Sequence, residues 1–277
     1  MNDLSKHLHD TYNVLFSTDF CGFLGNPLVA IDCLKMVCND EIKFGLEAVA
    51  FKHVIKNLHP KSLNGTSEFI GGYHGRIGWS ASDARTLFDH SKVLLLDSQI
   101  TETQLLLQIA SQFNRPIYVN IHEGELNSNL GNIQTNSTTL VVENDISPES
   151  VDKAFQLSDK LGIGRIYDLV HGGRSRPNFN WYKDWKVISD EMKKFRPTLV
   201  HIPIGTDASD SLPNIMPEQF WEELGKLRNE LCFFPIVECQ WGINRGSIIC
   251  EPHKDPWRIR YLQAKLKILV DNDVVKK

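Results

Sequence analysis

The strongest constraint on the fold is a strand–helix–strand unit at residues 139–172. A short apolar, β-branched run at 140–142 ends in Glu143. A helix follows, with apolar residues at helical spacing, and it is predicted to end at Gly162. The second strand ends at Asp168. Both strands therefore carry acids at their carboxyl ends, which is the edge where the loops of parallel β/α proteins form active sites.

The same alternation of strand and helix extends over the whole chain. Residues 80–113 contain a run without glycine or proline, and this favours a helix there over a further strand at 93–96. Residues 171–185 are predicted to form a long loop before a helix at about 185–194, and no element is predicted before residue 13. The predicted strands are 13–16, 42–51, 69–73, 116–121, 140–142, 165–167, 198–200 and 234–237.

Eight strands alternating with helices predict an α/β protein that forms a single (β/α)8 TIM barrel over residues 1–277, with a doubly wound open sheet as the alternative. Hydrophobic content of 42% and charged content of 23% are typical of a soluble globular protein. The net charge of −4 gives no general attraction to nucleic acid. There is no apolar run of membrane-spanning length and no signal-peptide core, and the six cysteines form no close pair, which predicts a cytoplasmic protein with reduced thiols.

Ionisable side chains recur where the predicted strands end. A closed barrel directs such positions toward one central cavity, where carboxylates and imidazoles would stay unpaired unless a cation bridged them. Mixed oxygen and imidazole ligands suit Zn, Mn, Fe or Co better than Mg or Ca alone, so one to three divalent ions are predicted. Glu47 faces the same end in this interpretation but is equally well explained as a surface strand residue. The predicted metal ligands are Glu143, Asp168, His201, Glu238, His74 and His122, with His171 three residues beyond Asp168.

Four short motifs carry a resemblance to a known group of proteins. They are VVEND at 141–145, YDLVH at 167–171, VH at 200–201 and IVE at 236–238. With these motifs the chain resembles the xylose-isomerase-like TIM barrels, which include sugar epimerases, inosose dehydratases and isomerases, endonuclease IV and the UV-damage endonucleases. The resemblance implies that Glu143, Asp168, His201 and Glu238 form the common metal ring. It implies that His171 is a substrate-side or second-metal residue.

The branches of this group differ in residues outside the ring. His74 and His122 lie where endonuclease IV-like members place two additional histidine ligands. The loop after the seventh strand lacks the Asp-x-His pair of those members, and it has Asp207 where epimerases usually place an arginine. The multinuclear iron oxidases follow the sixth-strand aspartate with asparagines, where this chain has Leu169, Val170 and His171.

The function predicted first is a metal-dependent sugar or polyol isomerase or epimerase. A chelated ion would acidify a C–H bond, Glu143 or Glu238 would move the proton through an enediolate, and His171 would orient or protonate an oxygen. The partner would be a small-molecule sugar or polyol. Trp241 is a candidate for excluding water from the substrate, although packing explains such a tryptophan equally well.

The alternative function is a phosphodiester hydrolase of the endonuclease IV type. His74 and His122 would then bind further ions, and Arg174, Arg176 and Arg245 would bind phosphate. Nucleic acid is a partner only under this alternative. A multinuclear iron oxidase and a non-catalytic barrel stand behind both, and the sequence leaves the oligomeric state open.

Overall fold

Eight parallel strands close into a barrel and pair in chain order, from β1 to β8 and back to β1. The structure is a computed structural model that describes residues 3–18, 27–49, 66–74, 102–122, 138–144, 149–205, 212–213, 215–240 and 256–277. The predicted single (β/α)8 TIM barrel is confirmed. The strands are β1 (Val14–Ser17), β2 (Phe44–Val49), β3 (Ile70–His74), β4 (Ile117–His122), β5 (Thr138–Glu143), β6 (Gly164–Asp168), β7 (Leu199–Gly205) and β8 (Phe234–Gln240).

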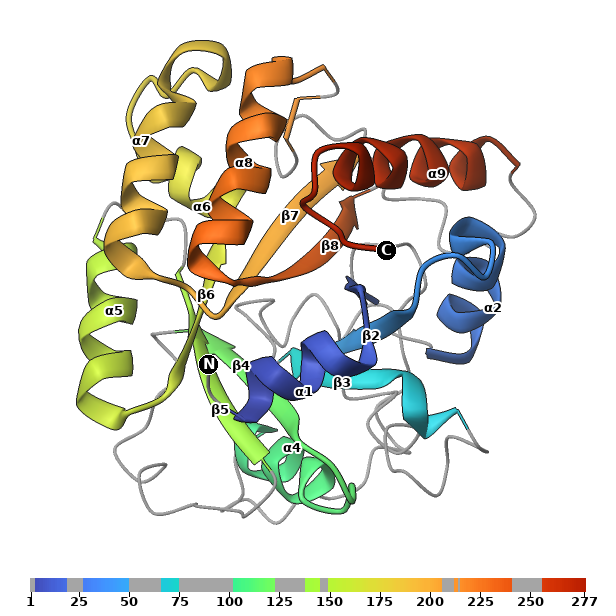
Figure 1. The fold of residues 1–277 in the computed structure, drawn as a ribbon. Coiled ribbons are helices and arrows are strands. Elements are labelled where there is room, and N and C mark those ends of the chain that lie inside the picture. The colour runs from blue at the N-terminus through green and yellow to red at the C-terminus, as the bar shows by residue number, and fades with distance from the viewer. Residues whose placement is uncertain are drawn as a thin grey trace, which may run out of the picture.

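Helices surround the strands on the outside (Figure 1). They are α1 (Asp3–Thr11), α2 (Pro27–Cys38), the short 3-10 helix η3 (Ser67–Phe69), α4 (Glu102–Ala110), α5 (Ser150–Leu161), α6 (Leu169–Arg174), α7 (Trp181–Phe195), α8 (Glu218–Leu231) and α9 (Pro256–Asp271). As predicted, α5 ends at Gly162, whose φ of 64° is the left-handed conformation that glycine adopts without strain. Among the described residues, no helix has the length and apolar character needed to cross a membrane.

Three segments differ from the sequence prediction. The chain begins with α1, because Leu4 and Leu8 form one apolar face on a turn of otherwise polar residues. The predicted loop at 171–185 instead contains the end of α6 and the start of α7, since Asp168 and Asn180 cap these helices with their side chains. Of the helix predicted at 80–113, α4 lies among the described residues, and the part before residue 102 lies outside them.

The side chains that enter the barrel follow the period of two that a strand imposes. On each of four consecutive strands an apolar residue enters near the amino end, and an ionisable residue enters two positions later on the same face. The apolar side chains fill the lower part of the interior, and the ionisable ones are stacked above them. These pairs are Val141 and Glu143, Ile166 and Asp168, Leu199 and His201, and Ile236 and Glu238.

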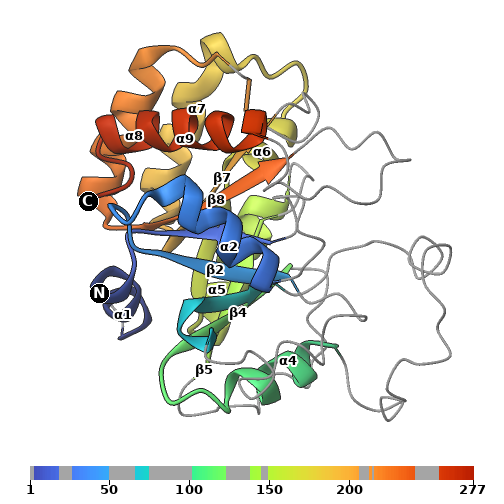
Figure 2. The ribbon, with the colours of Figure 1, turned by 90° about the vertical axis from the view of Figure 1, so that its right-hand side faces the viewer.

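Helix α1 closes the amino end of the barrel. Its Leu4 and Leu8, with the following Tyr12, belong to one buried cluster with inward-facing residues of the strands. Figure 2 shows α1 on the side away from the arrowhead of β8. We call this cluster the floor; its strand residues are Leu15, Tyr118, Val141, Ile166, Leu199, Phe234 and Ile236.

Replacing Leu8 with alanine is expected to lower the free energy of unfolding by about 2–5 kcal/mol, because the side chain is buried in the floor and its loss leaves a cavity. Urea denaturation measures this change. Leu28 is 41% exposed on α2 and serves as the control, since its replacement with alanine removes little buried surface. Equal destabilisation by both substitutions would contradict the described packing of α1.

Candidate active site

The ionisable residues predicted at the strand ends lie together above the floor. His74, His122, Glu143 and Asp168 are the last residues of β3, β4, β5 and β6. Parallel pairing places His122 beside Glu143 and Asp168 beside His201 in the barrel register. The six predicted metal ligands are between 0% and 4% exposed, with His201 fully buried and His74 the most exposed of them. The structure therefore brings together residues that are far apart in sequence.

His201 is the centre of this cluster. Its Nδ1 atom lies 3.2 Å from Glu143 Oε1, 3.2 Å from Glu238 Oε1 and 3.8 Å from Asp168 Oδ2. Its Nε2 atom lies 3.2 Å from Glu47 Oε2 on the opposite side of the ring. One imidazole thus contacts carboxylates from four strands.

Glu47 belongs to the cluster, which the sequence left open because a surface strand position explained this residue equally well. It is fully buried, and its Oε2 atom lies 3.3 Å from His74 Nδ1. The Tyr118 hydroxyl donates a hydrogen bond to Glu47 Oε1 at 3.0 Å. Gly72 makes room for this contact, because a Cβ atom there would overlap the Tyr118 ring. The available signal was a single acid inside the otherwise uncharged strand β2.

Two asparagines also contact the cluster and were not predicted. Asn120 on β4 donates a hydrogen bond to Glu143 Oε2. Asn144, which follows β5, accepts one from the backbone N–H of Asp168 at 2.8 Å. Both are buried: Asn120 lies inside β4, two residues before His122, and Asn144 directly follows Glu143. The two-residue period of β4 and the position after Glu143 were the signals that pointed to them.

His171 lies at the outer side of the cluster. Its Nδ1 atom is 3.0 Å from the backbone oxygen of Asn144 and 3.6 Å from Glu143 Oε1. Asp168 caps helix α6 by accepting a hydrogen bond from the backbone N–H of His171 at 2.6 Å. This cap fixes the start of the helix and the position of the His171 backbone. The His171 side chain is 22% exposed, so it joins the buried acids to the surface.

Burial and neighbouring charges shift the pKa values of these groups in opposite directions. Burial alone would raise the pKa of Glu47, but His201 and His74 lower it to about 2. Burial also opposes ionisation of Glu143, yet the neighbouring histidines hold its pKa well below the usual range. Burial raises the pKa of Glu238 well above its usual range, and the nearby carboxylates of Asp168 and Glu143 add to this against His201. The same cluster therefore shifts the pKa values of Glu143 and Glu238 in opposite directions.

The histidines respond to the same balance. Burial would lower the pKa of His74, but Glu47 and Glu143 raise it to about 9. Burial also opposes protonation of His201, and the surrounding glutamates raise its pKa well above the usual range. For His122, burial prevails and lowers the pKa. Burial and neighbouring carboxylates thus shift the pKa values of the three histidines in different directions.

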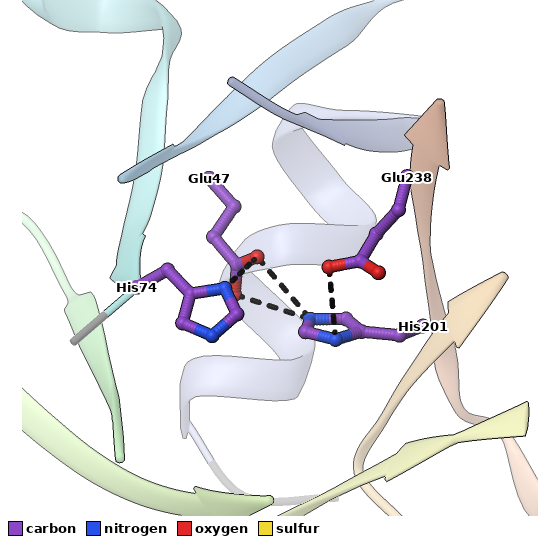
Figure 3. A group of neighbouring side chains, drawn as sticks. All are labelled: Glu47, His74, His201 and Glu238. Carbon is purple, nitrogen blue, oxygen red and sulfur yellow. Dashed lines mark hydrogen bonds and ion pairs between the residues drawn. The ribbon is translucent and has the colours of Figure 1, made fainter. Parts of the chain in front are cut away.

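Three sets of these side chains have the geometry to hold a metal ion. In each set, one ligand atom per residue lies within 4.8 Å of the others. Figure 3 shows the first set, in which side chains from β2, β3, β7 and β8 point toward one another. The sets are Glu47, His74, His201 and Glu238; His74, His122 and Glu143; and Glu143, Asp168 and His171.

The residues predicted to bind substrate are less clearly placed. Arg176 donates hydrogen bonds to Glu191 and to the backbone oxygen of Gly172, so its guanidinium holds α6 against α7. Arg174 lies at the end of α6. Arg245 and Trp241 lie outside the described residues. Their roles in binding substrate stay predictions.

Comparisons with known proteins give matches among solved structures. No family model and no curated protein matches the chain. An archaeal fructose 1,6-bisphosphate aldolase is 13% identical and has a TM-score of 0.45, with 96% of this chain and 98% of that chain covered. A Schiff-base-forming fructose-1,6-bisphosphate aldolase is also 13% identical, with a TM-score of 0.46 and coverage of 96% and 100%. A third structure, an archaeal fructose-1,6-bisphosphate aldolase with its catalytic Lys bound to a carbinolamine intermediate, has the same identity and TM-score with coverage of 96% and 99%.

These findings correct the expectation of a family. The matching structures are aldolases, so the predicted membership of the xylose-isomerase-like and endonuclease IV-like group is wrong. Short motifs at strand ends misled the prediction, because every TIM barrel gathers its functional residues there. At 13% identity and these TM-scores, no activity of the aldolases passes to this chain.

The functions drawn from that family are corrected with it. They are the metal-dependent sugar or polyol isomerase or epimerase, the phosphodiester hydrolase, the iron oxidase and the non-catalytic barrel. One of the matching structures is described as a Schiff-base-forming aldolase, and another as having a catalytic Lys bound to an intermediate. The predicted cofactor, one to three ions of Mn, Zn, Fe or Co, rested on the ionisable residues at the strand ends as well as on that family, and the same comparison contradicts it.

Proposed function

We propose that this barrel is an enzyme that transfers protons to and from a small polar molecule at Glu143 and His171. The observation that carries the proposal is the position of this pair. Glu143 is 1% exposed and His171 is 22% exposed, with 3.6 Å between Glu143 Oε1 and His171 Nδ1. A substrate that contacts His171 from solvent therefore reaches a desolvated carboxylate within one side-chain length.

The two residues take different roles. Glu143 is the general base, because its buried carboxylate lies 3.6 Å from His171, the cluster member that solvent reaches. His171 hydrogen-bonds or protonates a substrate oxygen, since it is the partly exposed member of the cluster. Glu238 acts on Glu143 indirectly through His201, because the His201 Nδ1 atom lies 3.2 Å from Glu143 Oε1 and 3.2 Å from Glu238 Oε1. Environments that shift the pKa values of neighbouring acids in opposite directions are typical of acid–base catalysts.

The substrate class follows from the groups that line the site. Carboxylates, imidazoles and amides bind hydroxyl groups well, which favours a hydroxyl-rich molecule such as a sugar.

We also propose that the protein is cytoplasmic. Cys33 and Cys38 are buried free thiols, which supports this location.

The Schiff-base chemistry named for the matching aldolases is not part of this proposal. Such a reaction needs a lysine amine that attacks the substrate carbonyl. The described strands β1 to β8 contain no lysine. Acid–base transfer by Glu143 and His171 uses groups that the described site does contain.

Hydrogen–deuterium exchange at carbon tests the proposal without knowledge of the product. The purified chain is incubated in D2O with a panel of small hydroxyaldehydes and hydroxyketones, and proton NMR follows the loss of C–H signal beside the carbonyl. We expect exchange above the protein-free rate for at least one compound. Rates equal to the protein-free rate across the panel would count against proton transfer at carbon.

A further inference from the structure

We propose that Asn144 is a positioning residue for His171: its backbone oxygen holds the hydrogen on Nδ1, so that Nε2 is the ring atom that exchanges a proton with the substrate. This inference rests on the proposed function and deepens it, because it names the reacting atom of His171 and the residue that selects it. The evidence is a set of hydrogen bonds that joins Asn144, Asp168 and His171 at the ends of β5 and β6.

The contact at Nδ1 fixes where the ring carries its hydrogen. His171 Nδ1 lies 3.0 Å from the backbone oxygen of Asn144, which is hydrogen-bond distance. A carbonyl oxygen has no hydrogen to donate, so the ring nitrogen is the donor. Glu143 Oε1 at 3.6 Å and Asp168 Oδ1 at 3.9 Å are too far from Nδ1 to compete for that hydrogen. In the neutral ring, Nε2 is therefore the nitrogen with the free electron pair.

The same contacts leave Nε2 to meet the substrate. The backbone oxygen of Asn144 and the carboxylates of Glu143 and Asp168 all face Nδ1. The two nitrogens lie on different sides of the imidazole ring, so Nε2 points away from these three groups. The three residues are between 1% and 2% exposed, whereas the His171 side chain is 22% exposed. A molecule that arrives from solvent therefore meets the ring at Nε2.

The side chain of Asn144 ties this residue to β6. Its Oδ1 atom accepts a hydrogen bond from the backbone N–H of Asp168 at 2.8 Å, and its Nδ2 atom donates one to the backbone oxygen of Asp168 at 3.3 Å. The register between β5 and β6 runs to Glu143 and Ile166, so the amide adds two hydrogen bonds beyond the last paired residues. Each amide atom faces a backbone group of the opposite kind, which sets the orientation of the amide. Asn144 is thereby held at the point where α6 begins.

Other contacts hold the backbone of α6. At the start of the helix, Asp168 accepts a hydrogen bond from the backbone N–H of His171 at 2.6 Å. Further along, Ser175 Oγ at 2.8 Å and the guanidinium of Arg176 both donate to the backbone oxygen of Gly172. Because these hydrogen bonds do not involve Asn144, we expect α6 to stay in place when the side chain of Asn144 is removed. Asn144 then acts on the ring of His171 rather than on the helix.

The position of the hydrogen matters for the proposed proton transfer. When the doubly protonated ring gives the proton on Nε2 to a substrate oxygen, the N–H bond breaks, an O–H bond forms, and the electron pair stays on Nε2. The ring is left neutral with its hydrogen on Nδ1, where Asn144 accepts it. Glu143 takes a proton from carbon in the same reaction, so the substrate gains one proton at oxygen for one lost at carbon.

Nuclear magnetic resonance of the histidine ring tests this assignment directly. The full-length chain is labelled with ¹⁵N in its histidines, and the signals of His171 are identified by their loss in His171→Asn. In a neutral ring, the nitrogen with a hydrogen and the nitrogen without one have widely separated ¹⁵N shifts. A free histidine in water carries its hydrogen mainly on Nε2, so the protein must impose the opposite form. We expect the Nδ1–H form to exceed the Nε2–H form by about 10-fold, the ratio that one hydrogen bond of the usual net strength produces.

Asn144→Ala tests the positioning role. Alanine makes neither hydrogen bond to Asp168, so the backbone oxygen of residue 144 is no longer held against Nδ1. We expect the ratio of the two neutral forms to fall by about 10-fold. We expect the rate of hydrogen–deuterium exchange at carbon to fall by about 10- to 100-fold, because a small misplacement of a catalytic group has an effect of this size.

The matched control is Asn272→Ala. It also removes a hydrogen bond from an asparagine amide to a backbone oxygen, here that of Ile268 in α9 at 2.9 Å. Both the ratio of the two forms and the exchange rate should equal those of the wild type.

Two outcomes would overturn the inference. One is a wild-type chain in which the Nε2–H form is as abundant as the Nδ1–H form or more so. The other is an Asn144→Ala chain, shown by circular dichroism to be folded, that keeps the wild-type ratio. If Asn144→Ala does not fold, the wild-type ratio alone decides. The ratio is measured without substrate, so a chain with the expected ratio and no exchange at carbon contradicts the proposed function and leaves the position of the hydrogen established.

Discussion

Replacing Glu143 with glutamine is expected to reduce the rate of hydrogen–deuterium exchange at carbon by about 100-fold or more, the range over which a positioned general base contributes. Glutamine has nearly the shape of glutamate, and its amide oxygen still accepts the hydrogen bond from Asn120. It has no basic carboxylate to take the proton. The rate is measured by proton NMR in D2O with the compound that the wild-type chain exchanges fastest.

The matched control for this substitution is Glu149→Gln. Glu149 is 76% exposed and pairs with Lys153 at the start of α5. Its exchange rate should equal that of the wild type. If Glu143→Gln, shown by circular dichroism to be folded, also exchanges at the wild-type rate, Glu143 is not the base.

Replacing Gly225 with alanine is expected to lower the free energy of unfolding by about 3 kcal/mol or more. Gly225 lies on the buried face of α8, and a Cβ atom there would overlap the backbone oxygen of Asn272, which follows α9. Because the obstacle is backbone, a side-chain rotation cannot relieve it, and α8 and the end of α9 must separate. Urea denaturation measures the change.

Lys226 is the control for Gly225. It is the next residue on α8 and is exposed, so Lys226→Ala should change the free energy of unfolding by no more than about 0.5 kcal/mol. A Gly225→Ala variant as stable as this control would show that α8 and the segment after α9 are not in close contact.

Much of the fold could be predicted from sequence because strands and helices have local signals. Short β-branched runs located the strands, and Gly162 located the end of α5. The two-residue period of a strand explains why Glu143 and Asp168 both enter the barrel. The helix α6 was missed because its stabilisation comes from the side chain of Asp168, whose role as a cap is visible only when the chain turns there.

The site was predicted in its positions but not in its contacts. That His201 lies between Glu47 on one side and Glu143 and Glu238 on the other depends on how the barrel closes. Closure sets the register between distant strands, and no local pattern encodes it. Glu47 was left out for this reason, since its neighbours in space come from β3, β4 and β7. The predicted family was wrong because a few ionisable residues at strand ends are common to many unrelated TIM barrels and do not identify one family.

The floor formed by α1 has a consequence for traffic through the molecule. With Leu4 and Leu8 buried in the floor, the described part of the barrel presents its ionisable residues on the side where His171 is partly exposed. A reactant would then have to reach Glu143 from the side of His171, and its product would have to leave by the same side. Release of the product would then set the rate at which the next reactant binds.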